Sequence, residues 1–333
     1  MAVLSHGAIE PLRLCAVIPL ELAGNRLDQA VSRIFMDYSR TALKDWILEG
    51  RLLVNGQKKR PRDPVAGGER VEVWVEVEEP ETVSLPQEIS LDILYEDEDL
   101  IIINKPVGLV VHPGAGNRKG TLLNALLHYD PPLANLPRAG IVHRLDRDTS
   151  GLLVITRTPR AHIQLVRQLQ SRTLTREYQA IVQGVMVAGR TVDLPIGRHA
   201  TDRTRMAVID EGKEAITHYR VIQRFRAHTH IRVKLETGRT HQIRVHMAHL
   251  GYPLVGDPVY GRRLCIPAGA SAEFTEALRG FKRQALHASR LCLTHPASGE
   301  RVEWQAPLPE DMTALLARLA EDARTHAESG NRG

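Results

Sequence analysis

The stretch His143-Arg144-Leu145-Asp146-Arg147-Asp148-Thr149-Ser150-Gly151 is followed directly by the apolar run Leu152–Ile155. A charged turn that ends in glycine and leads into a short apolar run predicts a loop feeding a buried strand. Such a strand gives the polar groups of the loop a rigid base, which suits a reactive carboxylate. A charged turn taken alone is more often a solvated surface loop, so the whole string has to be considered.

Two other chemistries fit parts of this turn. Asp146-Arg147-Asp148 is an Asp-x-Asp sequence, as in magnesium-dependent phosphotransferases that form an aspartyl phosphate. In those enzymes the apolar strand comes directly before the acids, whereas here it comes after them. Ser150 lies outside any Gly-x-Ser-x-Gly sequence, so a hydroxyl that ties the turn together is a better interpretation than a serine nucleophile.

The complete string His-Arg-Leu-Asp-x-x-Thr-Ser-Gly, with apolar residues after it, resembles the signature of the RluA/RluD-type pseudouridine synthases, which isomerise uridine in RNA. In that family the aspartate is catalytic, so the resemblance implies this role for Asp146. Two further segments match the family, Asn104-Lys105-Pro106-Val107-Gly108 and Gly238-Arg239-Thr240-His241-Gln242-Ile243-Arg244. The resemblance covers nearly everything from Leu91 to Pro307.

The resemblance also implies roles for three residues around the aspartate. Arg244 would pair with Asp146 and keep it ionised. Tyr178, in a predicted central strand, would line the pocket and stack on the flipped uracil. Arg144 would enter the base stack where the uridine has left, or else it serves only to pin the turn. Whether Asp146 attacks ribose C1′ or uracil C6, or assists glycosidic cleavage, stays open.

This chemistry requires neither a cofactor nor a metal. Isomerising uridine breaks the bond from N1 to the ribose and joins C5 to the same sugar carbon, with no redox change. His241, His246 and His249 invite a metal site, but no Asp-x-Asp, Cys or Glu set completes the coordination. We therefore expect no cofactor and no metal.

The N-terminal part of the chain has an uneven charge. Between Arg26 and Arg62 there are nine Lys or Arg residues against four Asp or Glu, and from Asp63 to Asp99 there are thirteen acids against one Arg. A basic module followed by an acidic connector predicts a patch for a polyanion, although charged surfaces often serve solubility alone.

The pattern of this basic module predicts a small α/β unit. Apolar spacing favours a helix over 27–35 and a second helix that Ser39 caps and Gly50 ends. A strand, a tight turn and an alternating strand follow at Leu52–Val54, Asn55-Gly56 and Val71–Val77. This order resembles the S4 RNA-binding module. Its basic face would contact RNA phosphates through Arg26, Arg33, Ser39, Arg40, Lys44, Arg51, Asn55, Lys58, Lys59 and Arg60.

Composition limits the class of protein. With 333 residues, 43% of them hydrophobic and 25% charged, the chain has the composition of an ordinary globular protein with room for two domains. Its three isolated cysteines form no disulfide framework, which fits a reducing cytoplasm. No apolar run approaches the ~20 residues of a membrane span, and the first residues lack a signal-peptide pattern. We expect a cytoplasmic monomer without a membrane partner.

These observations predict two domains. An S4-like domain would occupy 16–80, a linker 81–90 and a catalytic domain 91–320, with a disordered tail over 321–333. By resemblance the catalytic domain is of the α+β class, with a pseudouridine synthase fold on a mostly antiparallel mixed sheet.

The combination most resembles the RluD-like and RluC-like members of the family, which act on large-subunit ribosomal RNA, with the RluD-like members preferred. One alternative is a transfer-RNA-directed synthase of the same family. Another is a non-catalytic RNA-binding assembly factor on the same scaffold. The intact set of Asp146, Tyr178 and Arg244 argues against the second alternative, because a binding protein has no need of a carboxylate facing an arginine.

Overall fold

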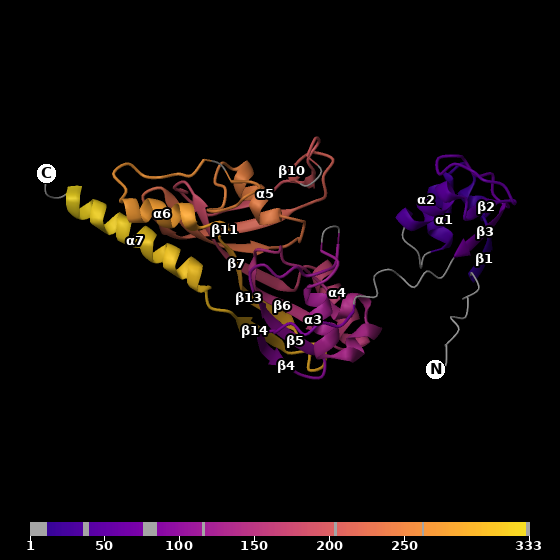
Figure 1. Ribbon diagram of the computed structural model, residues 1–333, viewed down its shortest axis with the longest axis horizontal. Coiled ribbons are helices and arrows are strands. Elements are labelled where there is room, and N and C mark those ends of the chain that lie inside the picture. Colours follow the sequence, from indigo (N-terminus) through magenta and orange to yellow (C-terminus); the bar gives the residue numbers. More distant parts are fainter. Residues whose placement is uncertain are drawn as a thin grey trace, which may run out of the picture. The chain divides into compact units, whose positions relative to one another are not determined.

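A computed structural model describes residues 12–35, 40–75, 85–114, 117–202, 205–261 and 263–330 (Figure 1). By its internal contacts the chain divides into two compact units, residues 1–83 and residues 84–333. This division falls inside the linker predicted over 81–90. Because each unit has its own apolar core, each is described by itself.

The first unit packs two helices on a small antiparallel sheet. Its core contains Leu27, Val31 and Leu43 from the helices and Val71 from the sheet. The strands are ordered β1-β3-β2. In chain order the elements are β1 (Leu12–Val17), η1 (Leu20–Leu22), α1 (Leu27–Ile34), α2 (Arg40–Glu49), β2 (Leu52–Val54) and β3 (Arg70–Val75).

Most of the elements predicted for this unit are present. Asn55 and Gly56 have φ angles of 48° and 75°, the left-handed conformation that a tight Asn-Gly turn requires. The predicted cap Ser39 lies outside the described residues. Strand β1 begins at Leu12, before the predicted S4-like range of 16–80, and pairs from there with Val75 of β3.

The second unit is built on one mixed sheet. Among the described residues it has nine strands, and only the contact between β13 and β6 is parallel. The predicted α+β class and mostly antiparallel sheet are therefore confirmed. In spatial order the strands are β4 (Ile93–Glu96), β5 (Leu100–Lys105), β6 (Ser150–Thr156), β13 (Leu286–Thr294), β7 (Thr175–Gln183), β12 (His228–Leu235), β11 (Ile216–Arg224) and β8 (Arg190–Asp193), with β14 (Arg301–Gln305) beside β13.

Helices and a short ribbon surround this sheet. Strands β9 (Ile196–Arg198) and β10 (Met206–Val208) pair with each other. The helices of the second unit are α3 (Leu122–Tyr129), η2 (Pro131–Asn135), η3 (Pro137–Gly140), α4 (Pro159–Gln170), α5 (Gln242–His249), α6 (Ala272–Gly280) and α7 (Glu310–Gly330). No helix in the described ranges is long and apolar enough to cross a membrane.

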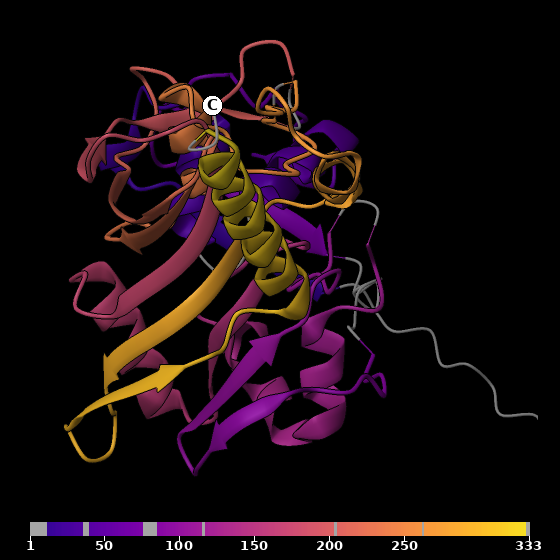
Figure 2. The same cartoon turned by 90° about the vertical axis from the view of Figure 1, so that its left-hand side faces the viewer.

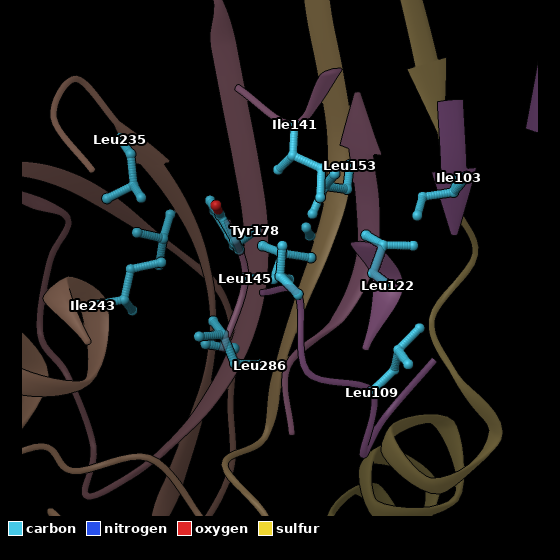
Figure 3. Packing of buried hydrophobic residues seen from close by; sticks show 14 of the residues in the cluster. Ile103, Leu109, Leu122, Ile141, Leu145, Leu153, Tyr178, Leu235, Ile243 and Leu286 are labelled. Carbon is cyan, nitrogen blue, oxygen red and sulfur yellow. The ribbon is translucent and has the colours of Figure 1, made fainter. Parts of the chain in front are cut away.

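The two faces of the sheet bury different apolar cores. All seven residues of β6 are buried, as the apolar run after the charged turn predicted. On one face, Leu145 of the charged turn packs in the same cluster as Tyr178 and Leu286 (Figure 3). On the other face, α4 contributes Leu165 to a cluster with Val154 of β6. The sheet thus supports the charged turn on its first face.

The second half of the predicted linker is part of the second unit. The Asn124 side-chain nitrogen donates to the Leu85 carbonyl (2.9 Å), and the Gln87 amide donates to the Asn124 carbonyl (3.0 Å). The Gly120 amide donates to the side-chain oxygen of Gln87 (2.6 Å). These hydrogen bonds hold residues 85–87 against α3, so the predicted linker over 81–90 includes residues that belong to the second unit.

The prediction of a disordered tail over 321–333 was wrong for residues 321–330, which continue helix α7. Figure 2 shows this helix lying in front of the sheet. Its buried side chains Met312 and Leu319 pack in a cluster with Ile181 of β7. Farther along, Asp322 forms an ion pair of 2.9 Å with Arg226, and both side chains are largely buried. A tertiary ion pair therefore holds a segment whose polar composition suggested disorder.

His228, at the start of β12, makes folding sensitive to acid. It is fully buried, and neither ring nitrogen has a hydrogen-bond partner among the described residues. Burial lowers the pKa of His228 to about 4. The unfolded chain takes up a proton there below about pH 6.5. Between these pH values the unfolded state binds more protons, so stability falls as the pH falls.

We predict that His228→Leu removes this contribution. Between pH 7 and pH 5 the wild type should lose about 2 kcal/mol more free energy of unfolding than the variant. Thermal unfolding at the two pH values measures the difference. His326→Leu, at an exposed position of α7, is the matched control and should lose as much as the wild type. Equal losses for His228→Leu and the wild type would contradict the prediction.

Candidate active site

A buried lysine holds the charged turn in position. Lys105, at the end of β5, is 1% exposed. Its Nζ donates hydrogen bonds to the carbonyls of Pro106 (2.7 Å), Leu109 (3.0 Å) and Arg147 (2.9 Å). Burial lowers the pKa of Lys105 to about 8, although the charges of the two nearby aspartates oppose this shift. Because all three protons of the ammonium group are used, the loop has a defined position directly after Asp146.

A glycine allows the turn to enter the sheet beside β13. Gly151 has a φ angle of 111°, which side chains rarely allow. A Cβ atom built on it would lie 2.2 Å from the carbonyl oxygen of Ala288. Within the turn, the Thr149 amide donates to the Asp146 carbonyl (3.1 Å). The glycine of the predicted motif thus lets β6 and β13 approach closely next to the aspartate.

Arg244 of α5 contacts two aspartates at once. Its Nη1 donates to Asp146 Oδ2 at 3.0 Å. Its Nε and Nη2 donate to the two carboxylate oxygens of Asp257, at 2.8 and 2.9 Å. The side chains of Arg244 and Asp257 are 5% and 0% exposed, whereas that of Asp146 is 16% exposed. The predicted contact between Arg244 and Asp146 is present, and Asp257 holds the guanidinium from its other side.

This arrangement keeps the arginine charged. Burial alone would lower the pKa of Arg244, but the hydrogen bonds and charge of Asp257, with those of Asp146, raise it above its ordinary value. Burial would raise the pKa of Asp257, but its hydrogen bonds with Arg244 and two backbone amides lower it. A permanent positive charge therefore lies 3.0 Å from the Asp146 carboxylate.

Tyr178 lies in the apolar wall of the site. It projects from β7 and is 5% exposed, in the cluster that contains Leu145 and Ile243 (Figure 3). Burial raises the pKa of Tyr178; the charge of Arg176 opposes the increase, and that of Asp146 adds to it. The phenol is therefore uncharged at neutral pH. The structure brings Tyr178, Asp146 and Arg244 to one face of the sheet.

His241 and Tyr260 form a part of the site that was not assigned from the sequence. His241 has a left-handed backbone (φ 57°) at the start of α5, and its Nε2 lies 3.9 Å from Asp146 Oδ1. The Met206 amide donates to the Tyr260 hydroxyl (2.8 Å), which can then donate its own proton to His241 Nδ1 (2.8 Å). Burial lowers the pKa of His241, although the charge of Asp146 opposes this. When the Tyr260 hydroxyl donates in this way, a neutral His241 ring carries its proton on Nε2, toward Asp146.

The sequence carried only an indirect signal for the additional residues. His241 stands inside the Gly-Arg-Thr-His-Gln-Ile-Arg string, and Asp257 and Tyr260 stand in Gly256–Gly261. The second stretch also resembles a segment of the family, but the resemblance implies no role for it. Asp257 is 13 residues from Arg244, and no periodicity indicates that they meet.

The other predicted residues lie at different places. Arg144 is exposed, and its side chain forms no hydrogen bond or ion pair with the described residues. His246 Nε2 donates to the Leu194 carbonyl (2.9 Å), and His246 Nδ1 forms a hydrogen bond with the Thr217 hydroxyl (2.9 Å). No group of three possible metal-binding side chains occurs in the described ranges.

The predicted basic face of the first unit is only partly free. Arg26 forms two hydrogen bonds with Asp28 (3.0 and 2.9 Å), and Arg51 forms an ion pair with Glu49 (3.0 Å). The side chain of Arg40 and the whole of Ser39 are outside the described residues. The predicted positions that are exposed are Arg33, Lys44, Asn55, Lys58, Lys59 and Arg60.

Removing Asp257 should destabilise the second unit. In Asp257→Ala the buried guanidinium of Arg244 loses two of its three hydrogen bonds, and leaving a buried charge without its partner costs about 3–5 kcal/mol. Glu321→Ala, which breaks the exposed pair of Arg318 and Glu321, is the control and should change stability little. Chemical denaturation measures both. A similarly small loss for Asp257→Ala would show that Arg244 does not depend on this anchor.

The comparisons with known proteins agree with this geometry. Residues 99–249 match the family model for RNA pseudouridylate synthase, and residues 25–71 match that for the S4 domain. Ribosomal large subunit pseudouridine synthase D of Escherichia coli (strain K12) is 57% identical over 318 residues, which cover 95% of this chain and 97% of that protein. The Pseudomonas aeruginosa (strain PAO1) protein of the same name is 57% identical over 311 residues, covering 93% and 97% of the two chains.

A solved structure shares the catalytic fold. Human RNA pseudouridylate synthase domain containing 1 matches with a TM-score of 0.53 and 26% sequence identity, over 70% of this chain and 89% of that chain. The predicted resemblance and the S4 module are thus confirmed. The chain belongs to the RluA/RluD-type family of RNA pseudouridine synthases and carries an S4 domain at its N-terminal side.

Proposed function

We propose that this enzyme converts uridine to pseudouridine in large-subunit ribosomal RNA, with Asp146 as the reacting carboxylate. The substrate assignment is supported by relatives named for the ribosomal large subunit that are 57% identical over nearly their whole length. The observation that carries the catalytic assignment is the contact between Asp146 Oδ2 and the buried Arg244 Nη1 at 3.0 Å.

The reaction moves one glycosidic bond. The bond between N1 and ribose C1′ breaks, the base turns, and a bond between C5 and C1′ forms; the proton on C5 leaves and N1 gains one. An ionised Asp146 fits attack on C1′, attack on C6 and assistance to bond cleavage alike, and the geometry does not choose among them. In each case Arg244 favours the charged carboxylate and fixes one of its oxygens, so that the other faces the substrate.

His241 positions this second oxygen. Its Nε2 lies 3.9 Å from Asp146 Oδ1, and a proton on that nitrogen favours one rotation of the carboxylate. Tyr178, held rigidly in the apolar wall, offers a flat ring on which the extruded uracil can stack. Because its phenol is neutral, it can take part in proton transfer only transiently. Arg144, exposed and without partners among the described residues, inserts its flat guanidinium into the gap that the base leaves, which offsets part of the unstacking cost.

The S4 domain supplies affinity that does not depend on sequence. Lys58, Lys59 and Arg60 are consecutive and exposed, so they can contact the backbone phosphates of a structured RNA. Each such contact releases counterions and makes binding dependent on salt. A non-catalytic protein on the same scaffold would bind this RNA and modify none of it.

We predict that Asp146→Asn abolishes catalysis but not RNA binding. The wild type, expressed in an Escherichia coli strain that lacks the 57% identical relative, should restore pseudouridines in large-subunit ribosomal RNA. Asp146→Asn should restore none, with a rate lower by at least about 10³-fold in vitro. Carbodiimide-stop sequencing of ribosomal and transfer RNA reads the sites.

The control for this experiment is the neighbouring acid. Asp148→Asn changes an aspartate that pairs with the exposed Arg147, and it should restore the same sites as the wild type. Full activity of Asp146→Asn would remove the catalytic assignment, and pseudouridines confined to transfer RNA would remove the substrate assignment. Binding without any modification by the wild type would favour the non-catalytic role.

A second prediction concerns the S4 domain. Exchanging Lys58, Lys59 and Arg60 for Glu should weaken binding of a large-subunit ribosomal RNA transcript and reduce the slope of log K against log [KCl] by about 2–3, since each phosphate contact contributes roughly 0.9 on a duplex. Turnover at saturating RNA should change little. Filter binding at four salt concentrations measures the slope, and an unchanged slope would refute the assignment of the basic face.

A further inference from the structure

The outer face of the sheet, opposite the proposed active site, has a hollow of about 680 Å³. Side chains on a strand alternate between the two faces of a sheet. Val233 and Tyr219 belong to the apolar core that includes Leu145 of the catalytic turn, so their neighbours in the chain project outward. We name this hollow the sheet-face groove and define it by its outward cations Arg220, Arg232 and Lys234.

The carboxylates that line the groove are already occupied. Glu177 forms an ion pair with Arg290 at 2.6 Å. Glu236 contacts His218 at 2.6 Å and Arg172 at 3.2 Å. The three defining cations are exposed, and none has a hydrogen bond or ion pair from its side chain to the described residues. None of the three cations therefore forms an ion pair among the described residues, although Lys234 is the register partner of Glu177, whose carboxylate pairs with Arg290.

Two of these charges lie side by side on neighbouring strands. Arg220 of β11 is the direct register partner of Arg232 of β12. Side chains at directly opposite positions lie about 5 Å apart, and like charges at such positions destabilise a sheet. Lys234 stands two residues along β12, on the same face and about 7 Å from Arg232. The free protein thus retains a repulsion between the two arginines. An anion bound over strands β11 and β12 would relieve it.

We propose that the sheet-face groove binds the phosphate backbone of the substrate RNA, outside the nucleotide that is modified. Guanidinium groups bind phosphate oxygens in a bidentate manner, and a row of cations on a rigid sheet fits a repeating anion. The proposal rests on the proposed function, which makes a large RNA the substrate. Contacts of this kind fix the position of the RNA without reading its sequence.

The topology of the sheet provides a route between the two faces. Strand β8 is at one edge of the sheet, and its residue Arg190 is exposed and also lines the groove. Arg190 is the register partner of Tyr219, so its side chain starts on the face of the active site. An RNA segment that leaves that face around β8 would meet positive charge at the edge before it reaches Arg220 and Arg232.

The test compares two variants with the same change in net charge. The groove variant is Arg220→Glu, Arg232→Glu and Lys234→Glu. The control is Arg279→Glu, Lys282→Glu and Arg324→Glu, three exposed positions on α6, after it and on α7. The probe is an Escherichia coli large-subunit ribosomal RNA transcript at four KCl concentrations. The groove variant should lose about 2 or more from the slope of log K against log [KCl], and at least tenfold in affinity beyond the control.

Two further measurements separate this proposal from its alternatives. Turnover at saturating RNA should be retained in the groove variant, so failure of the catalytic assignment, seen with Asp146→Asn, is distinguishable from failure of this one. The single change Arg220→Glu turns a like-charge pair into an opposite-charge pair, so it should raise the melting temperature of the free protein while it weakens RNA binding. Equal salt slopes in the groove variant and the control would overturn the proposal, as would unchanged RNA affinity in Arg220→Glu.

Discussion

The guanidinium of Arg244 imposes the constraint on which the site depends. It is almost fully buried, and a buried charge is tolerated only when hydrogen bonds and an opposite charge replace its water. Asp257, itself fully buried, accepts two of these hydrogen bonds, and Asp146 accepts the third. Because Asp257 is bound to the backbone amides of Val259 and Tyr260, the arginine cannot move away with its partner. Nη1, the donor that Asp257 does not use, therefore determines where the Asp146 carboxylate must lie.

The rest of the catalytic unit brings distant segments to this point. Asp146 comes just before β6 and Tyr178 lies on β7, and these strands are separated in the sheet by β13, which comes from the end of the chain. Strand β13 runs parallel to β6 and antiparallel to β7. Forming this sheet thus requires the segments near residues 150, 178 and 288 to come together.

The sequence predicted what is written in local patterns or in a motif. The apolar run after Gly151 gave a fully buried strand, the spacing after Arg26 gave α1, and Asn55-Gly56 gave a left-handed turn. The contact of Arg244 with Asp146 followed from a family resemblance, since 98 residues separate them. The anchor Asp257 and the neighbour His241 were not assigned, because hydrogen-bond partners across a fold leave no periodic signal. For the same reason the end of α7 was missed: Asp322 depends on Arg226, 96 residues earlier.

The charged residues of this chain differ in a way that follows from burial. Arg244 and Lys105 are inside, and every hydrogen of Lys105 Nζ has a protein acceptor, so their charges hold the charged turn in position. Arg220, Arg232 and Lys234 are outside, where water removes most of the cost of a charge, and they have kept no protein partner among the described residues. Solvation makes an unpaired surface cation inexpensive, but it does not explain two arginines at directly opposed positions of a sheet. A bound polyanion explains this arrangement, because its phosphates attract both arginines and so offset the repulsion between them.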